Sequence, residues 1–91
     1  MQKEMQDKKT ESDLYRDFLN IWHPCTQQKD FETTKPLMVE RAEGIYLFDR
    51  QGKRYLDAIS SWWVNLLGHN HPALNAAIKT QLEKMAHVMF A

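Results

Sequence analysis

The chain has 91 residues, enough for one small domain or for part of a larger one. Its twelve basic and twelve acidic residues cancel, which excludes a global field that would attract nucleic acid or an anionic membrane surface. A single cysteine excludes an internal disulfide and a cysteine-rich zinc site, and it fits a reducing, cytoplasmic setting.

The first residues predict a solvated tail. Residues 1–13 are mostly Gln, Lys, Glu and Asp, and they lack the apolar core of a secretory signal. We therefore expect a disordered tail over 1–13 and a folded but incomplete domain over 14–91.

A short helix and an aromatic turn are predicted next. Ser12 is positioned to cap a helix. One face of that helix is apolar at helical spacing: Leu14, Tyr15, Phe18 and Leu19. Pro24 ends the apolar pattern, so residues 22–26 predict a turn, and the polar residues 27–36 predict a loop.

The middle of the chain predicts a small antiparallel meander. Residues 37–42, 45–48 and 53–57 have the β-branched and aromatic content of strands. Glu43-Gly44 and the run from Asp49 to Gly52 separate these strands as turns, since glycine tolerates positive φ.

A second, amphipathic helix is predicted from Pro72 to Ala86. Proline is favoured at the first helical position, where its missing N–H costs no hydrogen bond. An apolar stripe follows at helical spacing: Leu74, Ala77, Ile78, Leu82 and Met85. Residues 86–91 stay mostly apolar to the end, which indicates that the chain is part of a longer protein.

Between these elements, residues 58–78 carry no formally charged side chain. The Asn, Ser, His and Pro residues of this window argue against a membrane span, so we expect a buried segment or the wall of a pocket. If the segment is extended, Trp62 and Trp63 point to opposite faces. Both rings filling a core is the simpler interpretation, whereas the neighbouring polar Ser60, Ser61 and Asn65 favour a pocket wall.

Two further features have a chemical and a structural interpretation. His69-Asn70-His71 offers two metal ligands where zinc needs three or four, so we expect these side chains to serve the Gly68 turn and to cap the following helix. Cys25 lacks a base suited to activating a nucleophile, because His23 is too close in sequence, and a buried or pocket-facing thiol is the simpler interpretation. Neither a phosphate-binding glycine loop nor a catalytic triad can be drawn from these residues.

Five motifs in order resemble one family. They are Trp22-His23-Pro24, the Asp49-x-x-Gly52-x-x-Tyr55-Leu56-Asp57 run, Ser60-Ser61-Trp62-Trp63, Gly68-His69-Asn70-His71-Pro72 and His87-Val88-Met89-Phe90. Together, over about residues 19–91, they resemble the beginning of the pyridoxal-phosphate-dependent class III aminotransferases. The first and third motifs resemble more narrowly the branch that aminates 8-amino-7-oxononanoate in biotin synthesis.

This resemblance implies an α+β segment of a fold-type I transferase: a short helix, a meander and an amphipathic helix. It implies that Trp62 walls the substrate site while Trp63 turns toward the core, and that Cys25 replaces a substrate-contacting Tyr of the family. That replacement removes a phenol donor, which leaves S-adenosylmethionine or lysine open as the amino donor. The catalytic lysine, the partner of the pyridine nitrogen and the phosphate-binding turn belong to the missing downstream part, so no residue of this chain is expected to be catalytic. The complete enzyme is expected to be a cytoplasmic homodimer that acts on small molecules.

Two other functions stay open. One is a stand-alone, non-catalytic binding module that kept the sequence of such an enzyme. The other is a class III transaminase acting on a different amine, against which the Ser-Ser-Trp-Trp motif argues.

Overall fold

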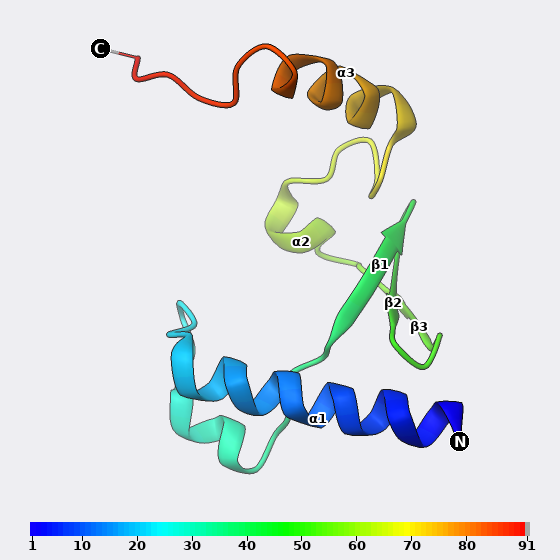
Figure 1. The fold of residues 1–91 in the computed structure, drawn as a ribbon, viewed down its shortest axis with the longest axis vertical. Coiled ribbons are helices and arrows are strands. Elements are labelled where there is room, and N and C mark those ends of the chain that lie inside the picture. The colour runs from blue at the N-terminus through cyan, green and yellow to red at the C-terminus, as the bar shows by residue number, and fades with distance from the viewer. Residues whose placement is uncertain (91) are drawn as a thin grey trace. The chain divides into compact units, whose positions relative to one another are not determined.

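The computed structural model of the protein describes residues 1–90 (Figure 1). The elements follow in the order α1 (Gln2–Asn20), a 3-10 turn η1 (Gln28–Glu32), β1 (Val39–Glu43), β2 (Tyr46–Asp49), β3 (Arg54–Leu56), α2 (Ser60–Trp63) and α3 (Pro72–Leu82). The predicted α+β organisation is therefore confirmed. Among residues 1–90, no helix combines the length and the apolar character needed to cross a membrane.

The helix α1 begins well before the predicted cap. It runs from Gln2, so residues 2–13 are helical where we expected a disordered tail, and Ser12 lies inside the helix. The reason is that Gln, Lys, Glu and Met are good helix formers and that no Gly or Pro interrupts them. The helix ends where Ile21 turns extended, three residues before Pro24.

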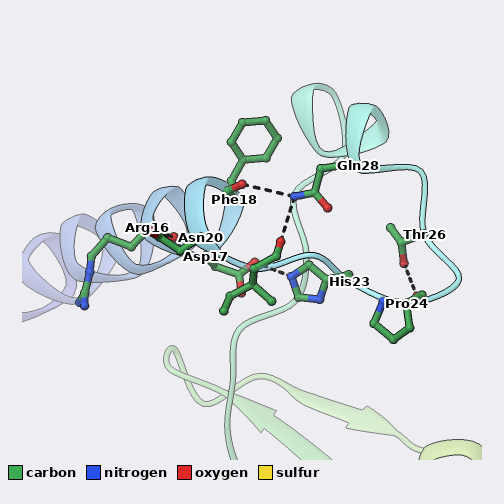
Figure 2. A network of polar contacts seen from close by, with 9 residues as sticks. Arg16, Asp17, Phe18, Asn20, His23, Pro24, Thr26 and Gln28 are labelled. Atoms are coloured by element: carbon green, nitrogen blue, oxygen red, sulfur yellow. Dashed lines mark hydrogen bonds and ion pairs between the residues drawn. The ribbon is translucent and has the colours of Figure 1, made fainter.

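The turn after α1 is confirmed, and the loop after it contains a helical turn. Pro24 and Cys25 form the predicted turn, in which the Thr26 hydroxyl donates to the Pro24 carbonyl over 2.9 Å (Figure 2). The region 27–36 contains η1, closed by the Asp30 N–H donating to the Gln27 carbonyl over 2.9 Å.

The predicted meander is confirmed, with each strand within two residues of its expected bounds. The three strands pair in the order β1-β2-β3. The turn from Asp49 to Gly52 is closed by the Gly52 N–H donating to the Asp49 carbonyl over 3.0 Å. Gly52 has a φ of +80°, which explains why glycine stands there.

The helix α3 begins at Pro72 as predicted and ends at Leu82, before the predicted Ala86. Its end tightens because the Lys84 N–H donates to the Gln81 carbonyl, a three-residue spacing. His71 precedes the helix but makes no side-chain capping bond, which corrects the expected role of this histidine.

The structure divides into two compact units, residues 1–41 with 48–54 and residues 42–47 with 55–91. Over residues 1–90 no side chain is fully buried, so the hydrophobic faces of α1 and α3 are largely exposed. Most of the charge-free window is exposed as well, and none of it is fully buried, so of the two expectations burial is wrong within the described residues.

Candidate functional site

The segment that carries both tryptophans is a left-handed turn. Ser60, Ser61, Trp62 and Trp63 have φ values of +50°, +45°, +71° and +67°. The Trp63 N–H donates to the Ile59 carbonyl over 2.8 Å, and the Val64 N–H donates to the Ser60 carbonyl over 3.0 Å. The segment is therefore coiled with the opposite hand to an α-helix and is not extended, so the condition for placing the two indoles on opposite faces is not met.

This conformation is costly for residues with side chains. A left-handed residue other than glycine is disfavoured by roughly 1–2 kcal/mol, because its Cβ approaches the following carbonyl. Four such residues in a row persist only where surrounding contacts hold them. Strained backbone of this kind concentrates at functional sites, which makes α2 the first candidate in this chain.

Contacts of the Asp57 carboxylate hold the turn. Its Oδ1 accepts the Ser61 N–H over 3.0 Å, and its Oδ2 accepts the Ser61 hydroxyl over 2.8 Å. The Oδ2 also lies 2.6 Å from the Nε2 of His69. The two Ser61 bonds and the His69 bond all favour the charged carboxylate, so the pKa of Asp57 lies below its ordinary value.

The imidazole of His69 is fixed from its other side. The Asn65 amide nitrogen lies 3.2 Å from the His69 Nδ1. The same amide nitrogen lies 3.4 Å from Nε2. Because the Asp57 carboxylate can only accept, the His69 Nε2 carries the proton in their 2.6 Å contact. The Asp57 and His69 side chains are only 6% and 13% exposed, so their contact is largely enclosed.

The backbone of the turn between β1 and β2 anchors both partners. The His69 N–H donates to the Gly44 carbonyl over 2.7 Å, and the Gly44 N–H returns a bond to the His69 carbonyl over 3.2 Å. The Asp57 N–H donates to the Ile45 carbonyl over 2.9 Å. Gly68 permits this approach, since a Cβ there would lie 3.0 Å from the Gly44 oxygen.

A small cavity of about 200 Å³ lies beside this network. Its lining is made of Gly44, Ile45, Asp57, Ser60, Asn65, Leu66, Gly68 and His69. It is smaller than the roughly 300–1,000 Å³ of ordinary ligand pockets. The cavity itself is therefore a gap inside the scaffold, and the tryptophans are the part of the turn that can reach a ligand.

Both predicted aromatic residues are accessible. Trp62 is 58% exposed and Trp63 is 80% exposed. The interpretation of both rings as core aromatics is wrong for this chain, and Trp63 does not turn into a core formed by residues 1–90. The role of Trp62 as a substrate wall stays a prediction.

Cys25 belongs to the first compact unit, whereas Trp62 belongs to the second. The Cys25 thiol is exposed, where we expected a buried or pocket-facing group, and its residue has a φ of +52° at the corner of the Pro24 turn. Whether Cys25 contacts substrate stays a prediction.

The neighbours of Cys25 form a polar network of their own (Figure 2). His23 lies 2.7 Å from an Asp17 oxygen and meets the edge of the Phe31 ring, with the ring centres 5.3 Å apart. The Gln28 amide donates to the carbonyls of Phe18 and Ile21 over 3.3 and 3.4 Å. His23 is therefore paired with the Asp17 carboxylate, and Gln28 ties η1 to the end of α1.

A mostly apolar hollow of about 400 Å³ lies elsewhere in the first unit, between α1 and the η1 region. Leu14, Tyr15, Phe18, Phe31 and Pro36 supply its apolar lining. The Lys35 amine pairs with Glu11 over 2.6 Å at exposed positions beside it. Asp17 and Glu32 also line this hollow, and Asp17 is paired with His23.

Sequence reasoning missed the functional link between Asp57 and His69. His69 was weighed as a metal ligand, yet within residues 1–90 no three His, Cys, Asp or Glu side chains gather closely enough to hold a metal ion. The sequence signal for this link is Asp57, the last charged residue before the charge-free window. A carboxylate in surroundings that exclude water needs a hydrogen-bonding partner.

Comparisons with known proteins identify the family to which this chain is similar. Residues 27–91 match the family model of the class-III aminotransferases. The chain is 54% identical over 67 residues to the adenosylmethionine-8-amino-7-oxononanoate aminotransferase of Aquifex aeolicus, an alignment that covers 74% of this chain and 15% of that protein.

Solved structures show the same similarity. The crystal structure of adenosylmethionine-8-amino-7-oxononanoate aminotransferase from Methanocaldococcus jannaschii matches with 47% identity and a TM-score of 0.74, covering 81% of this chain and 17% of that one. An (S)-enantioselective omega-transaminase from Thermomicrobium roseum matches with 32% identity and a TM-score of 0.79, covering 87% and 18%. The chain thus spans between 15% and 18% of the length of these relatives.

Proposed function

The chain belongs to the class-III aminotransferases, and from this premise we propose that it forms the N-terminal segment of a subunit that aminates 8-amino-7-oxononanoate. The product is 7,8-diaminononanoate, on the route to biotin. The observation that carries the proposal is the higher identity to relatives named for this acceptor than to the omega-transaminase structure.

We propose S-adenosylmethionine as the amino donor, because the relatives of higher identity carry that molecule in their names. Trp62 supports this choice chemically, since an exposed indole can stack on a flat adenine and can also pack against an aliphatic chain. Cys25 brings no phenol hydroxyl, so lysine is the donor to compare with it.

The family cofactor, pyridoxal phosphate, supplies an electron sink once a lysine amine carries it. The cavity beside Asp57 is lined by no lysine and no arginine. Lys79 and Lys84 are the lysines among the described residues of the second unit, and both are exposed on α3 or just after it. These residues do not fit the covalent anchor or the phosphate site, so we assign both to the remainder of the subunit.

What this chain contributes is therefore substrate binding and orientation. The left-handed turn presents an indole on a backbone held by Asp57, and a ring fixed in this way loses little freedom when it meets a ligand. The turn needs no proton transfer of its own.

We propose a cytoplasmic homodimer for the complete enzyme. The free, exposed thiol of Cys25 suits a reducing compartment. The exposed apolar residues of α3 need a cover, which the remainder of the subunit and its partner can supply: Leu74, Ile78 and Leu82.

A chimera tests the function. This chain replaces the aligned segment of the Methanocaldococcus jannaschii enzyme, and amino transfer from S-adenosylmethionine to 8-amino-7-oxononanoate is measured beside transfer from lysine. We expect activity within about tenfold of the parent enzyme, because the segment acts through binding.

The parent enzyme and a chimera carrying the aligned omega-transaminase segment are the matched controls. If the chimera binds pyridoxal phosphate yet transfers nothing to this acceptor, the proposed acceptor is wrong. Transfer from lysine alone would overturn the proposed donor and keep the acceptor.

A further inference from the structure

The left-handed turn at Ser60–Trp63 contains no glycine, although glycine adopts this conformation at no steric cost. Elsewhere in the chain, all three glycines take positive φ values: +58° at Gly44, +80° at Gly52 and +81° at Gly68. Four consecutive side-chain residues in α2 therefore depend on contacts for their conformation, and those contacts are open to mutation.

The contacts converge on one residue of the turn. Ser61 is bound twice by Asp57, through its N–H and through its hydroxyl. These two bonds fix the backbone immediately before Trp62. The other side-chain bonds of this network join Asn65 to His69 and His69 to Asp57, and neither involves an indole.

The carboxylate is itself held in place. His69 donates to Asp57 over 2.6 Å, and the backbone of Gly44 and Ile45 binds both partners. Asp57 and His69 are enclosed while Trp62 is more than half exposed. The Asp57–His69 pair is thus enclosed by the strands and loops that hold the turn, whereas the Trp62 ring is accessible to a ligand.

We propose that Asp57, oriented by His69, is a positioning residue that keeps the Ser60–Trp63 turn left-handed and so fixes the Trp62 indole for substrate. The pair touches no reacting atom in this account. Its structural part stands by itself, and its effect on substrate binding rests on the function proposed above.

The structural part is tested by nuclear magnetic resonance on the 91-residue chain. At positive φ, the amide hydrogen and the Hα of the same residue lie close together, which gives a strong intraresidue Overhauser signal. We expect strong signals at residues 60–63 in the wild type. Asp57→Ala should reduce them to the intensity of ordinary residues, and Asp49→Ala, which removes a carboxylate from a different turn, should leave them unchanged.

A conservative pair of variants separates positioning from simple packing. His69→Ala should weaken the signals, and His69→Gln should restore them, because the glutamine amide can donate to Asp57 from a similar place. Weak signals in the wild type, or signals that survive Asp57→Ala, overturn the proposal.

The functional part uses the chimera described above. Asp57→Ala should raise the KM for substrate about tenfold with kcat little changed, since a displaced wall weakens ground-state and transition-state binding alike. An unchanged KM in a variant whose turn signals are lost overturns the positioning role. Inactivity of the unmutated chimera contradicts the proposed function and leaves the resonance result standing.

Discussion

Asp49 and Asp57 each lead into a turn directly after strand residues, and in both turns the carboxylate accepts backbone N–H groups. Asp49 accepts from Gln51 over 3.0 Å and from Lys53 over 2.8 Å, and Gly52 supplies the left-handed residue. Asp57 accepts from Ser61 over 3.0 Å, and four side-chain residues are left-handed. The Asp49 carboxylate accepts N–H groups two and four residues away, whereas the Asp57 carboxylate also accepts from a hydroxyl and from an imidazole twelve residues away.

This comparison indicates that the Asp49 turn serves only to reverse the chain, whereas the Asp57 turn exposes side chains that a ligand can contact. A glycine turn reverses the chain at the lowest cost and shows little to a ligand. The Asp57 turn accepts strain and displays two indoles. Local sequence preferences predict a glycine turn of the first kind. A strained turn without glycine, such as the second, is expected mainly at functional sites.

The largest effect is expected from the paired substitutions Gly68→Ala and Gly52→Ala. Both glycines have φ near +80°, but a Cβ at Gly68 would lie 3.0 Å from the Gly44 oxygen, and one at Gly52 would meet nothing within 4 Å. We expect Gly68→Ala to destabilise its turn by about 2–3 kcal/mol and Gly52→Ala by about 1 kcal/mol.

Amide hydrogen exchange measures this pair. The His69 amide reports on the first substitution and the Asp49 amide on the second, since both donate across the affected turns. Equal losses of protection would contradict the close approach of Gly68 to Gly44.

A smaller effect of opposite sign is expected from Ser60→Gly. Ser60 has a φ of +50°, so glycine should stabilise the left-handed turn by about 1 kcal/mol and raise protection of the Trp63 amide. Ser12→Gly is the matched control inside the right-handed helix α1, where it should cost about 0.5 kcal/mol and reduce the helical circular dichroism. Destabilisation by both substitutions would show that the Ser60 conformation is not strained.

The smallest effect is expected from acid, because a neutral carboxyl group at Asp57 still accepts the Ser61 N–H. The folded-state pKa of Asp57 is lowered, chiefly by the Ser61 N–H and hydroxyl and then by His69. The resulting stabilisation is present above the ordinary carboxyl pKa of about 3.9 and is lost as the pH falls through the lower folded-state value.

The intraresidue signals at residues 60–63 are followed from neutral pH downward to check this sign. They should persist at pH 5 and weaken only below about pH 4. Asp57→Asn should keep a weaker turn without this acid dependence, because its amide does not titrate there. Loss of the signals between pH 7 and 5 would contradict the role of the carboxylate, which stays charged over that range.

Much of the fold could be predicted because local chemistry decides it. The meander follows from Gly44, Gly52 and the β-branched and aromatic runs, and Pro72 marks the start of α3. The motif order also predicted the family, which the match over residues 27–91 confirms.

The candidate site could be predicted only in part. No glycine signals positive φ at Ser60–Trp63, so the left-handed turn has no local sequence signal. The Asp57–His69 contact that supports it joins residues twelve positions apart. Helix α1 extends through a polar segment by propensity, where charge pattern suggested disorder. The prediction of burial was the least successful. An apolar pattern shows which faces need a packing partner, but it does not show whether this part of the chain supplies one.

The most direct test compares Trp62→Ala with Trp63→Ala in the chimera by measuring the KM for 8-amino-7-oxononanoate and for S-adenosylmethionine. We expect Trp62→Ala to raise at least one KM about tenfold and Trp63→Ala to change both by less than about twofold. A larger effect from Trp63→Ala, or no effect from Trp62→Ala, would contradict the claim that the left-handed turn presents Trp62 to substrate.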